Sequence, residues 1–480
     1  MKNLLEIIKD KKICVFDLDG TIADTEKFHW VAHKELLKKM NVNLNDEDIQ
    51  KYIGHNDYQI FEMIEKDFGV IIDKEKMKQK RLAIFRDLVK QYNLLPHEEV
   101  IYTIKNFKGK KIILSSQNEF TIKKLLLDWG ILEYFEKIIS LEFTRESKIE
   151  IIPKMGPAND IVWFEDNPKI INEGKYHGYT MVGVRHYYNK NIEIDADYII
   201  DNTNKTNALF VGLCTKDIIY YVENLPKFNK KIKTEEFKTY IGGPATNAAI
   251  TFSMLGGNAT IATCLGDSEE SKAIIQKLNN YGVTVLNYSL ENKYPNTASI
   301  IISNDGDRTV ISGQNQFNHE IKFDLNNFNF DLVLFDGNQQ EISLDILDYF
   351  KKSNFKNIVL DAGSWKNNIS KFLVNSNIII SSEDFVNKEG LNLLQLNLDE
   401  SKYKAITRGG KSIISNLGEI PITSSSKVID TLGAGDIFHG AFCFYYFNNK
   451  NNFYDSLKLA SYIASKSVEF KGPREWINHI

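Results

Sequence analysis

Two short segments place acidic residues where phosphoryl chemistry would need them. In "ICVFDLDGTIADTE", Asp17 and Asp19 follow an apolar run and lie two positions apart. Side chains two apart at the end of a strand point the same way, so both carboxylates would leave one sheet edge together. Such a pair needs a cation, and Mg²⁺ is a hard cation that takes carboxylate oxygens. The pattern predicts a site where one aspartate attacks phosphorus and the other moves a proton.

The second segment, "VIDTLGAGDIFHGAF", joins a glycine turn to a helix. The backbone amides of Gly433, Ala434 and Gly435 would be exposed at the helix N-terminus, where the helix dipole also favours an anion. Asp436 follows at the rim of this anion hole. Its carboxylate could take a proton from a substrate hydroxyl as that hydroxyl attacks the γ-phosphate of a nucleotide. The glycine spacing differs from that of a Walker-type loop, which excludes a P-loop enzyme.

The composition limits the class of protein. The chain has 480 residues, of which 43% are hydrophobic and 25% charged, so two or three globular domains are expected. A formal net charge of -4 gives no electrostatic case for nucleic acid or an anionic membrane, and no apolar run is long enough to span a bilayer. The cysteines are scattered without metal or disulfide spacing, which favours buried thiols in a reducing compartment. A cytoplasmic protein with small-molecule partners is expected.

Apolar runs alternate with helical patterns along the chain, which predicts an α/β fold with wound parallel sheets. Residues 26–92 interrupt the first such pattern and have apolar positions at helical spacing, so they would form a helical cap. A cap there would cover the carboxyl edge of the sheet, where ligands of open α/β sheets bind. The polar tract "DNTNKTN" precedes a fresh strand and marks a boundary. The predicted domains are residues 1–203 and 204–480, the second with a few extra antiparallel strands.

The first domain resembles the haloacid dehalogenase (HAD) superfamily, in the helical-cap group that includes β-phosphoglucomutase and many sugar-phosphate phosphatases. The resemblance covers about residues 11–200 and rests on "DLDGTIADTE", "KIILSSQN" and "IVWFEDN". It implies a Rossmann-like parallel sheet, an aspartyl-phosphate formed on Asp17 and proton transfer by Asp19. A lone histidine on a helix is more often structural, so His29 is not included in the site.

The same resemblance implies the groups that hold phosphate and metal. Thr21 and Ser115 would contact the phosphate together with one lysine. The segment before the last acidic motif, "RESKIEIIPKMG", is shortened, so Lys148 is the choice for this lysine and Lys154 the alternative. The implied ligands of Mg²⁺ are Asp17, Asp19, Glu165 and Asp166.

The second domain resembles the ribokinase/PfkB carbohydrate kinase family over about residues 207–480. The glycine turn before Asp436 matches the family signature, and "YIGGPATNAAITFSMLGGNATIATCLGD" matches its N-terminal motif. The resemblance implies ATP as co-substrate, Asp436 as base and a small β-lid over the sugar that could also form a homodimer. The implied sugar contacts are Asp217, Gly242, Gly243, Asn247 and Arg308. The implied nucleotide contacts are Thr407, Gly409, Gly410 and the turn 433–435, with "ASYIASKSVEFKGPR" as a final helix beside adenine.

The two sites together suggest a bifunctional enzyme. A phosphatase and a kinase on one chain are productive if they act on different positions of a sugar or sugar phosphate. The sequence therefore predicts Mg²⁺-dependent phosphate removal together with ATP-dependent phosphorylation. Two alternatives stay open. The first domain could be a phosphomutase, since "DTEKFH" is similar to the mutase subgroup, or one domain could bind sugar phosphate without catalysis and regulate the other.

Overall fold

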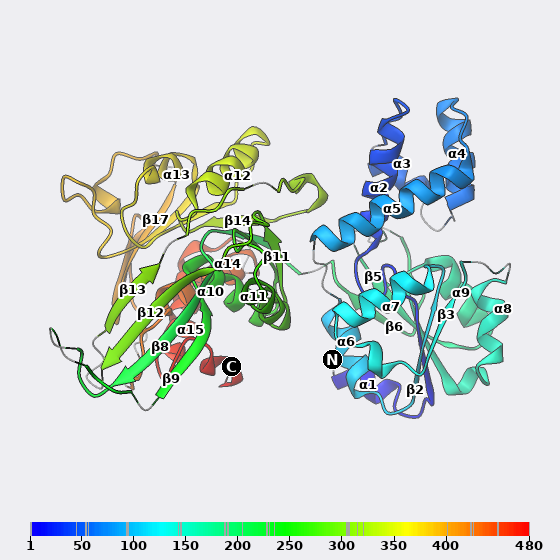
Figure 1. The fold of residues 1–480 in the computed structure, drawn as a ribbon, viewed down its shortest axis with the longest axis horizontal. Helices are drawn as coiled ribbons and strands as arrows, with labels where there is room; N and C mark the ends of the chain where they lie inside the picture. Colours follow the sequence, from blue (N-terminus) through cyan, green and yellow to red (C-terminus); the bar gives the residue numbers. More distant parts are fainter. Residues whose placement is uncertain are drawn as a thin grey trace. The chain divides into compact units, whose positions relative to one another are not determined.

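The chain folds into two compact units, Met1–Asn204 and Lys205–Ile480 (Figure 1). The structure is a computed structural model. It describes all residues except 1, 45, 53–54, 56, 93–95, 143, 145, 187–188, 190–191, 204, 227–228, 230, 235, 304–307, 314, 320, 401, 423–424, 426, 449–450 and 480. The division between the units lies within the polar tract "DNTNKTN".

A parallel sheet forms the centre of unit 1. Its strands are β1 Ile13–Phe16, β2 Lys110–Ser115, β3 Lys137–Ser140, β4 Ile161–Glu165, β5 Thr180–Arg185 and β6 Tyr198–Asp201. They lie in the order β3-β2-β1-β4-β5-β6, and each neighbouring pair is parallel. Strands β1 and β4 are buried along their whole length and are apolar except for Glu165 at the end of β4, as expected for strands covered on both faces. The predicted parallel sheet is confirmed.

Helices in unit 1 belong either to the sheet or to a separate cap. They are α1 Lys2–Ile7, α2 Glu26–Lys38, α3 Asp46–Tyr52, α4 Asp57–Phe68, α5 Lys74–Tyr92, α6 Glu98–Asn106, α7 Glu119–Asp128, α8 Lys148–Ile151 and α9 Pro168–Tyr176. Helices α2 to α5 stand together away from the sheet (Figure 1) and pack around their own core, which includes Trp30, Phe61 and Ile64. The apolar positions at helical spacing therefore build a helical cap, as predicted.

Unit 2 has a larger sheet at its centre. Its strands are β7 Asn207–Val211, β10 Asn258–Thr263, β11 Val283–Asn287, β14 Leu332–Phe335, β15 Ile358–Ala362, β16 Ile378–Ser382, β17 Tyr403–Arg408, β18 Lys411–Ser415 and β19 Gly418–Ile420. The order is β11-β10-β7-β14-β15-β16-β17-β18-β19. The strands from β11 to β17 are parallel, whereas β18 and β19 add antiparallel pairs at one edge.

A second, smaller sheet in unit 2 matches the expected β-lid. It contains β8 Thr215–Val222, β9 Glu236–Gly242, β12 Asn296–Ser303 and β13 Arg308–Gly313, in the order β13-β12-β8-β9. Strand β12 pairs parallel with β8, while the two outer pairs are antiparallel. The lid is therefore a mixed sheet, because β8 and β12 are joined through a long stretch of chain and not by a hairpin.

Helices of unit 2 cover the larger sheet. They are α10 Pro244–Met254, α11 Glu269–Asn280, α12 Gln340–Lys352, α13 Ile369–Asn375, α14 Ala434–Asn448 and α15 Phe453–Ser467. Helices α10 and α14 approach each other closely at Gly440, where an added Cβ would lie 2.2 Å from the carbonyl oxygen of Ala248. This close approach brings the N-terminal turns of both helices together, so side chains from the two turns can meet.

Two further expectations concern the chain as a whole. Cys14, Cys214, Cys264 and Cys443 are free thiols, and all four are buried. Among the helices of the described residues, none combines the length and the hydropathy needed to cross a bilayer.

Candidate active sites

Strands β1 and β4 bring three carboxylates together in unit 1. Phe16 pairs with Phe164, and the Asp17 amide continues the pairing by donating to the Phe164 carbonyl at 3.0 Å. Asp17, Glu165 and Asp166 therefore lie at adjacent strand ends, and one ligand oxygen from each lies within 4.8 Å of the others. Oδ1 of Asp17 is buried without a hydrogen-bond partner among the described residues. An orphaned carboxylate oxygen within an all-oxygen donor set fits Mg²⁺.

Lys148 completes this group of acids. Ser147 caps α8 and forms a capping box with Glu150, which fixes Lys148 in the first turn. The Lys148 Nζ lies 2.8 Å from Oδ2 of Asp17 and 2.7 Å from Oε2 of Glu165. Burial acts to lower the pKa of Lys148, but the two carboxylates outweigh it and the pKa is raised, so the ammonium stays charged. Lys154 is exposed and pairs with Glu146 outside the group.

The turn after β1 shapes the phosphate side of the site. Gly20 has φ +70°, and an added Cβ would lie 2.4 Å from Oδ2 of Asp166, so this position requires glycine. The Thr21 hydroxyl is buried and donates to Oδ1 of Asp166 at 3.4 Å. Ser115 is buried at the end of β2, where its hydroxyl accepts from the Gln117 amide at 3.2 Å.

Asp19 lies near the carboxylates of Asp17, Glu165 and Asp166, but its own carboxylate makes other contacts. Its Oδ1 accepts from the Thr25 hydroxyl at 2.6 Å and lies 3.3 Å from Nε2 of His29. Burial acts to raise the pKa of Asp19, but His29 and Thr25 outweigh it and the pKa is lowered. Among the described residues, the carboxylate of Asp19 is not part of the set formed by Asp17, Glu165 and Asp166, and its role as a Mg²⁺ ligand stays a prediction.

His29 connects Asp19 to the cap. Its Nδ1 contacts the Arg81 guanidinium, and its ring stacks on Phe85 with centroids 3.9 Å apart. Arg81 in turn pairs with Asp57 at 2.9 Å. Sequence reasoning set His29 aside as a structural histidine. The useful signal was its position one helical turn after Thr25, since side chains four apart share a helix face.

In unit 2, Asn247 and Asp436 meet at the helix pair α10 and α14. The Asn247 Nδ2 donates to Oδ2 of Asp436 at 2.7 Å. Gly433 has φ +74°, and an added Cβ would lie 3.4 Å from Nδ2 of Asn247, so the glycine turn leaves room for this contact. The Ala434 amide of the predicted anion hole donates to the Thr431 carbonyl at 3.3 Å, and Gly435 is exposed in the first turn of α14.

Burial raises the pKa of Asp436 to about 7, and Asp361 adds to the rise. The hydrogen bond from Asn247 and the nearby His439 oppose it. The His439 Nδ1 lies 3.4 Å from Oδ2 of Asp361 and 2.7 Å from the Gly435 carbonyl. A carboxylate with a pKa near neutrality is suited to accept a proton from an alcohol and to release it again.

Three residues that were predicted to contact sugar lie in or next to the lid: Asp217 on β8, Gly242 at the end of β9 and Gly243 at the start of α10. Asp217 on β8 accepts from the Thr215 hydroxyl at 2.6 Å, and burial raises the pKa of Asp217. An added Cβ on Gly242 would lie 1.8 Å from Oδ2 of Asp217, and one on Gly243 would lie 2.2 Å from the Leu213 carbonyl. Both glycines are therefore required by close approach of the chain to Asp217 and to the loop before β8.

The remaining predicted contacts lie further along the sheet and the lid. Thr407 ends β17, where its hydroxyl donates to the Ser381 carbonyl at 3.1 Å. Gly409 and Gly410 form the exposed turn after β17. Arg308 is exposed on the edge strand β13, and within the described part of the chain it makes no hydrogen bond or ion pair with Asp217, Asn247 or Asp436.

The end of the chain differs from expectation. The final helix α15 stops at Ser467, before the predicted run is complete. Gly472 has φ +81° and Pro473 follows, so the segment leaves helical geometry. It turns back to the site, where Arg474 donates to Oδ1 of Asn247. Sequence reasoning missed Arg474 because its partner is distant in the chain.

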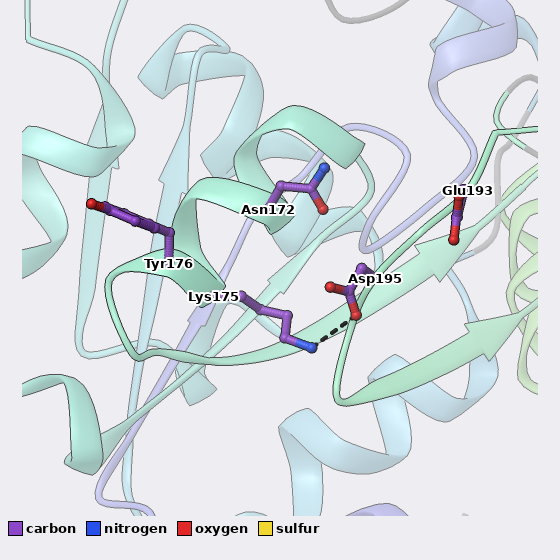
Figure 2. A pocket seen from close by; sticks show the side chains of 5 residues that line it. All are labelled: Asn172, Lys175, Tyr176, Glu193 and Asp195. Carbon is purple, nitrogen blue, oxygen red and sulfur yellow. Dashed lines mark hydrogen bonds and ion pairs between the residues drawn. The ribbon is translucent and has the colours of Figure 1, made fainter.

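A surface pocket elsewhere in unit 1 is lined by Asn172, Lys175, Tyr176, Glu193 and Asp195 (Figure 2). Lys175 and Asp195 form an ion pair at 2.8 Å across it. No residue of the acid group lines this pocket.

Comparisons with known proteins relate each unit to a different family. The family model for haloacid dehalogenase-like hydrolases matches residues 14–184, and the model for the pfkB family carbohydrate kinases matches residues 205–479. A ribokinase of Dictyostelium discoideum is 26% identical over 308 residues, which cover 56% of this chain and 96% of the relative. A nucleoside kinase of Methanocaldococcus jannaschii is 29% identical over 280 residues, covering 55% and 90%. A phosphoglycolate phosphatase of Aquifex aeolicus is 26% identical over 144 residues, covering 28% and 64%.

The family resemblances expected from the motifs are confirmed by these matches. Since the kinase match spans more than half of the chain, the protein belongs to the pfkB family of carbohydrate kinases, and it carries a haloacid dehalogenase-like hydrolase domain in the same polypeptide.

Proposed function

We propose that the protein is a bifunctional sugar-phosphate enzyme, with a Mg²⁺-dependent phosphatase in unit 1 and an ATP-dependent sugar kinase in unit 2. The observation that carries the proposal is that each unit holds its own set of carboxylates with the partners that phosphoryl transfer needs. In unit 1 these are Asp17, Lys148 and the two acids at the end of β4, Glu165 and Asp166. In unit 2 they are Asp436 and Asn247 beside the glycine turn.

In the phosphatase reaction, Asp17 attacks phosphorus and forms an aspartyl-phosphate, while Asp19 donates a proton to the leaving oxygen. Water then attacks the aspartyl-phosphate, and Asp19 takes its proton. Lys148 compensates the charge on Asp17 and on the phosphoryl oxygens, and Thr21 and Ser115 hold those oxygens. Asp17, Glu165 and Asp166 would hold Mg²⁺, which when bound neutralises negative charge on the phosphate. Thr25 and His29 keep Asp19 oriented for proton transfer.

In the kinase reaction, Asp436 takes the proton of a sugar hydroxyl as that oxygen attacks the γ-phosphate of ATP. Asn247 and Asp217 hold the sugar, and the amides of the turn 433–435 stabilise negative charge on the transferred group. Thr407, Gly409 and Gly410 would lie along the nucleotide. The relatives named as a ribokinase and a nucleoside kinase support an acceptor that contains a sugar. A homodimer formed through the lid belongs to the same proposal.

The two activities are productive together if the kinase adds a phosphate group at one position of the sugar and the phosphatase removes a different phosphate group from another position. This is tested by incubating the protein with ATP, Mg²⁺ and a set of sugar phosphates, then locating phosphate by phosphorus NMR. A product phosphorylated at a new position, with loss of the older group, supports the proposal. Release of free phosphate and unphosphorylated sugar from every substrate contradicts it.

A second candidate for unit 1 is a phosphomutase, which returns the phosphoryl group to sugar. The contacts of Asp19 with Thr25 and His29 favour this candidate, because they link the proton-transferring acid to the cap that would cover a sugar. Isotopic label on the aspartyl-phosphate distinguishes the two, since a mutase transfers it to product and a phosphatase releases it as phosphate.

The remaining alternative is that one unit only binds sugar phosphate and regulates the other. Asp17→Asn and Asp436→Asn, made separately, test it. A catalytic unit loses its own turnover while the other unit keeps its activity, whereas a purely binding unit shows no turnover in the wild-type protein.

A further inference from the structure

Arg474 is a buried cation next to the proposed kinase base. Its side chain donates to Oδ1 of Asn247 at 2.5 Å, to the Ile241 carbonyl at 2.8 Å and to the Pro473 carbonyl at 2.9 Å. Only 7% of its surface is exposed. No carboxylate of the described residues lies within ion-pair distance of it, so its hydrogen bonds to oxygen atoms must compensate for lost water.

The contact with Arg474 decides which way the Asn247 amide points. An arginine side chain can only donate hydrogen bonds, whereas an asparagine amide has one donor end and one acceptor end. The end of Asn247 that faces Arg474 must therefore be its oxygen, and the opposite end, Nδ2, faces Oδ2 of Asp436 at 2.7 Å. Rotation of the amide by half a turn would place donor against donor on one side and oxygen against oxygen on the other.

The segment that carries Arg474 is tied to the glycine turn. One carboxylate oxygen of Asp430 accepts from the Leu432 amide and the other from the Gly472 amide, both at 2.9 Å. Trp476 is buried and donates from its indole to the Pro473 carbonyl at 3.0 Å. These contacts hold the guanidinium at a fixed position relative to the turn before Asp436.

We propose that Arg474 is a positioning residue of the kinase reaction, which fixes the amide of Asn247 so that Asn247 donates to Asp436 and holds its carboxylate toward the acceptor hydroxyl. The inference rests on the proposed role of Asp436 as the base. The resemblance to the kinase family implies only a final helix beside adenine for the segment that ends at Arg474, so this role is a different one.

The arrangement also affects the protonation of Asp436. Asp361 and Asp336 disfavour its charged form, while Asn247 and His439 favour it. Asp436 raises the pKa of Arg474 against the effect of burial, and the interaction is reciprocal, so the guanidinium favours the ionised carboxylate. Loss of Arg474 releases the Asn247 amide as well, and both changes move the pKa of Asp436 upward.

A double-mutant cycle tests whether Arg474 acts through Asn247. The variants are Arg474→Met, Asn247→Leu and the double variant, with Arg474→Lys as a donor-only replacement and Lys466→Met as a control in the same C-terminal region. Kinase kcat and KM are measured from pH 5 to 9 on the full-length chain. We expect Arg474→Met to lower kcat about tenfold to a hundredfold and to move the acidic limb of the profile to higher pH. Arg474→Lys should lower kcat less than Arg474→Met does.

The double variant should be no worse than Asn247→Leu alone, because the two residues act in series. If the losses in kcat of the two single variants multiply in the double variant, or if the acidic limb of the pH profile does not move in Arg474→Met, the inference is wrong. The kinase would in that case still depend on Asp436. For the control Lys466→Met, both the phosphatase activity and the unfolding profile should be unchanged, which shows that the chain of this variant folds normally.

A second measurement needs no turnover and keeps the inference separate from the proposed function. Unfolding temperature is followed against pH for the wild type, Arg474→Met and Asp436→Asn. The Asp436-dependent loss of stability with rising pH should extend to higher pH in Arg474→Met, and identical curves for Arg474→Met and wild type contradict the inference. If Arg474 changes the Asp436-dependent pH profile of stability in this way but the wild type phosphorylates no sugar, the proposed function is contradicted and the inference is not.

Discussion

The Nζ atom of Lys148 lies 2.8 Å from Oδ2 of Asp17, and both side chains are buried. A buried carboxylate without this cation would hold a proton more readily, because burial already raises the pKa of Asp17 and Lys148 is the group that opposes the rise. Asp17, the proposed nucleophile, and Lys148 therefore form one electrostatic pair, and the shortened segment before β4 still places an ammonium group beside Asp17.

We expect Lys148→Met to reduce phosphatase kcat by about a hundredfold to a thousandfold, since it removes a charge that stabilises both the nucleophile and the transferred group. Lys154→Met is the matched control, because Lys154 is exposed and pairs with Glu146 outside the acid group. Initial rates of phosphate release measure both. Equal rates for wild type and Lys148→Met would mean that the neutralising cation comes from elsewhere.

The contact between Asp19 and His29 leads to a second prediction. His29→Leu removes a partner that lies 3.3 Å from Oδ1 of Asp19 and breaks the connection to Arg81 in the cap. We expect about a tenfold loss of phosphatase kcat, comparable to the loss of one hydrogen bond to a charged group. His177→Leu, on the exposed end of α9, should have no effect. A His29→Leu variant with wild-type kcat would assign His29 to packing alone.

The protonation of Asp436 predicts how the kinase depends on pH. Because burial raises its pKa to about 7 and the base must be ionised, kcat should fall as the pH drops through about 7. In Asp436→Asn, kinase activity should be lost at every pH. A rate that stays level from pH 8 to pH 5 would contradict the assignment of Asp436 as base.

The same group predicts an effect on stability. The pKa of Asp436 is higher in the folded state than in the unfolded state, so ionisation of its carboxylate destabilises the folded state. The stability that the protonated group contributes is therefore lost as the pH rises through about 7. Asp436→Asn should therefore stabilise unit 2 at pH 8 by about 2 kcal/mol and have little effect at pH 4. Calorimetric unfolding at the two pH values measures this. A stabilisation of equal size at pH 4 would point to a cause other than ionisation.

The acid group predicts a metal dependence for unit 1. Asp166→Asn removes one charged ligand of the set formed with Asp17 and Glu165, so the Mg²⁺ concentration for half-maximal phosphatase activity should rise about tenfold or more. Titration of Mg²⁺ after treatment with a chelator measures the change. Glu173→Gln, on the exposed side of α9, is the control. An unchanged titration curve for Asp166→Asn would exclude Asp166 as a ligand.

The fold and part of each site follow from local patterns in the sequence. Glu165 and Asp166 could be named beside Asp17 from the family resemblance alone, and the parallel pairing of β1 with β4 brings the three carboxylates together. Asn247 and Asp436 could be named from their motifs, but the direct hydrogen bond between them depends on the close packing of α10 on α14. The direction of the Asp19 carboxylate and the turn that carries Arg474 depend on contacts between distant segments, which periodicity and spacing do not encode.

The Asp430 carboxylate joins the amides of Leu432 and Gly472, and so makes the C-terminal residues part of the kinase site. Under the proposed function, removal of the segment that carries Arg474 would therefore abolish phosphorylation by unit 2, and dephosphorylation by unit 1 would continue. A proteolytic cut before Arg474 would then leave only the proposed phosphatase activity of unit 1.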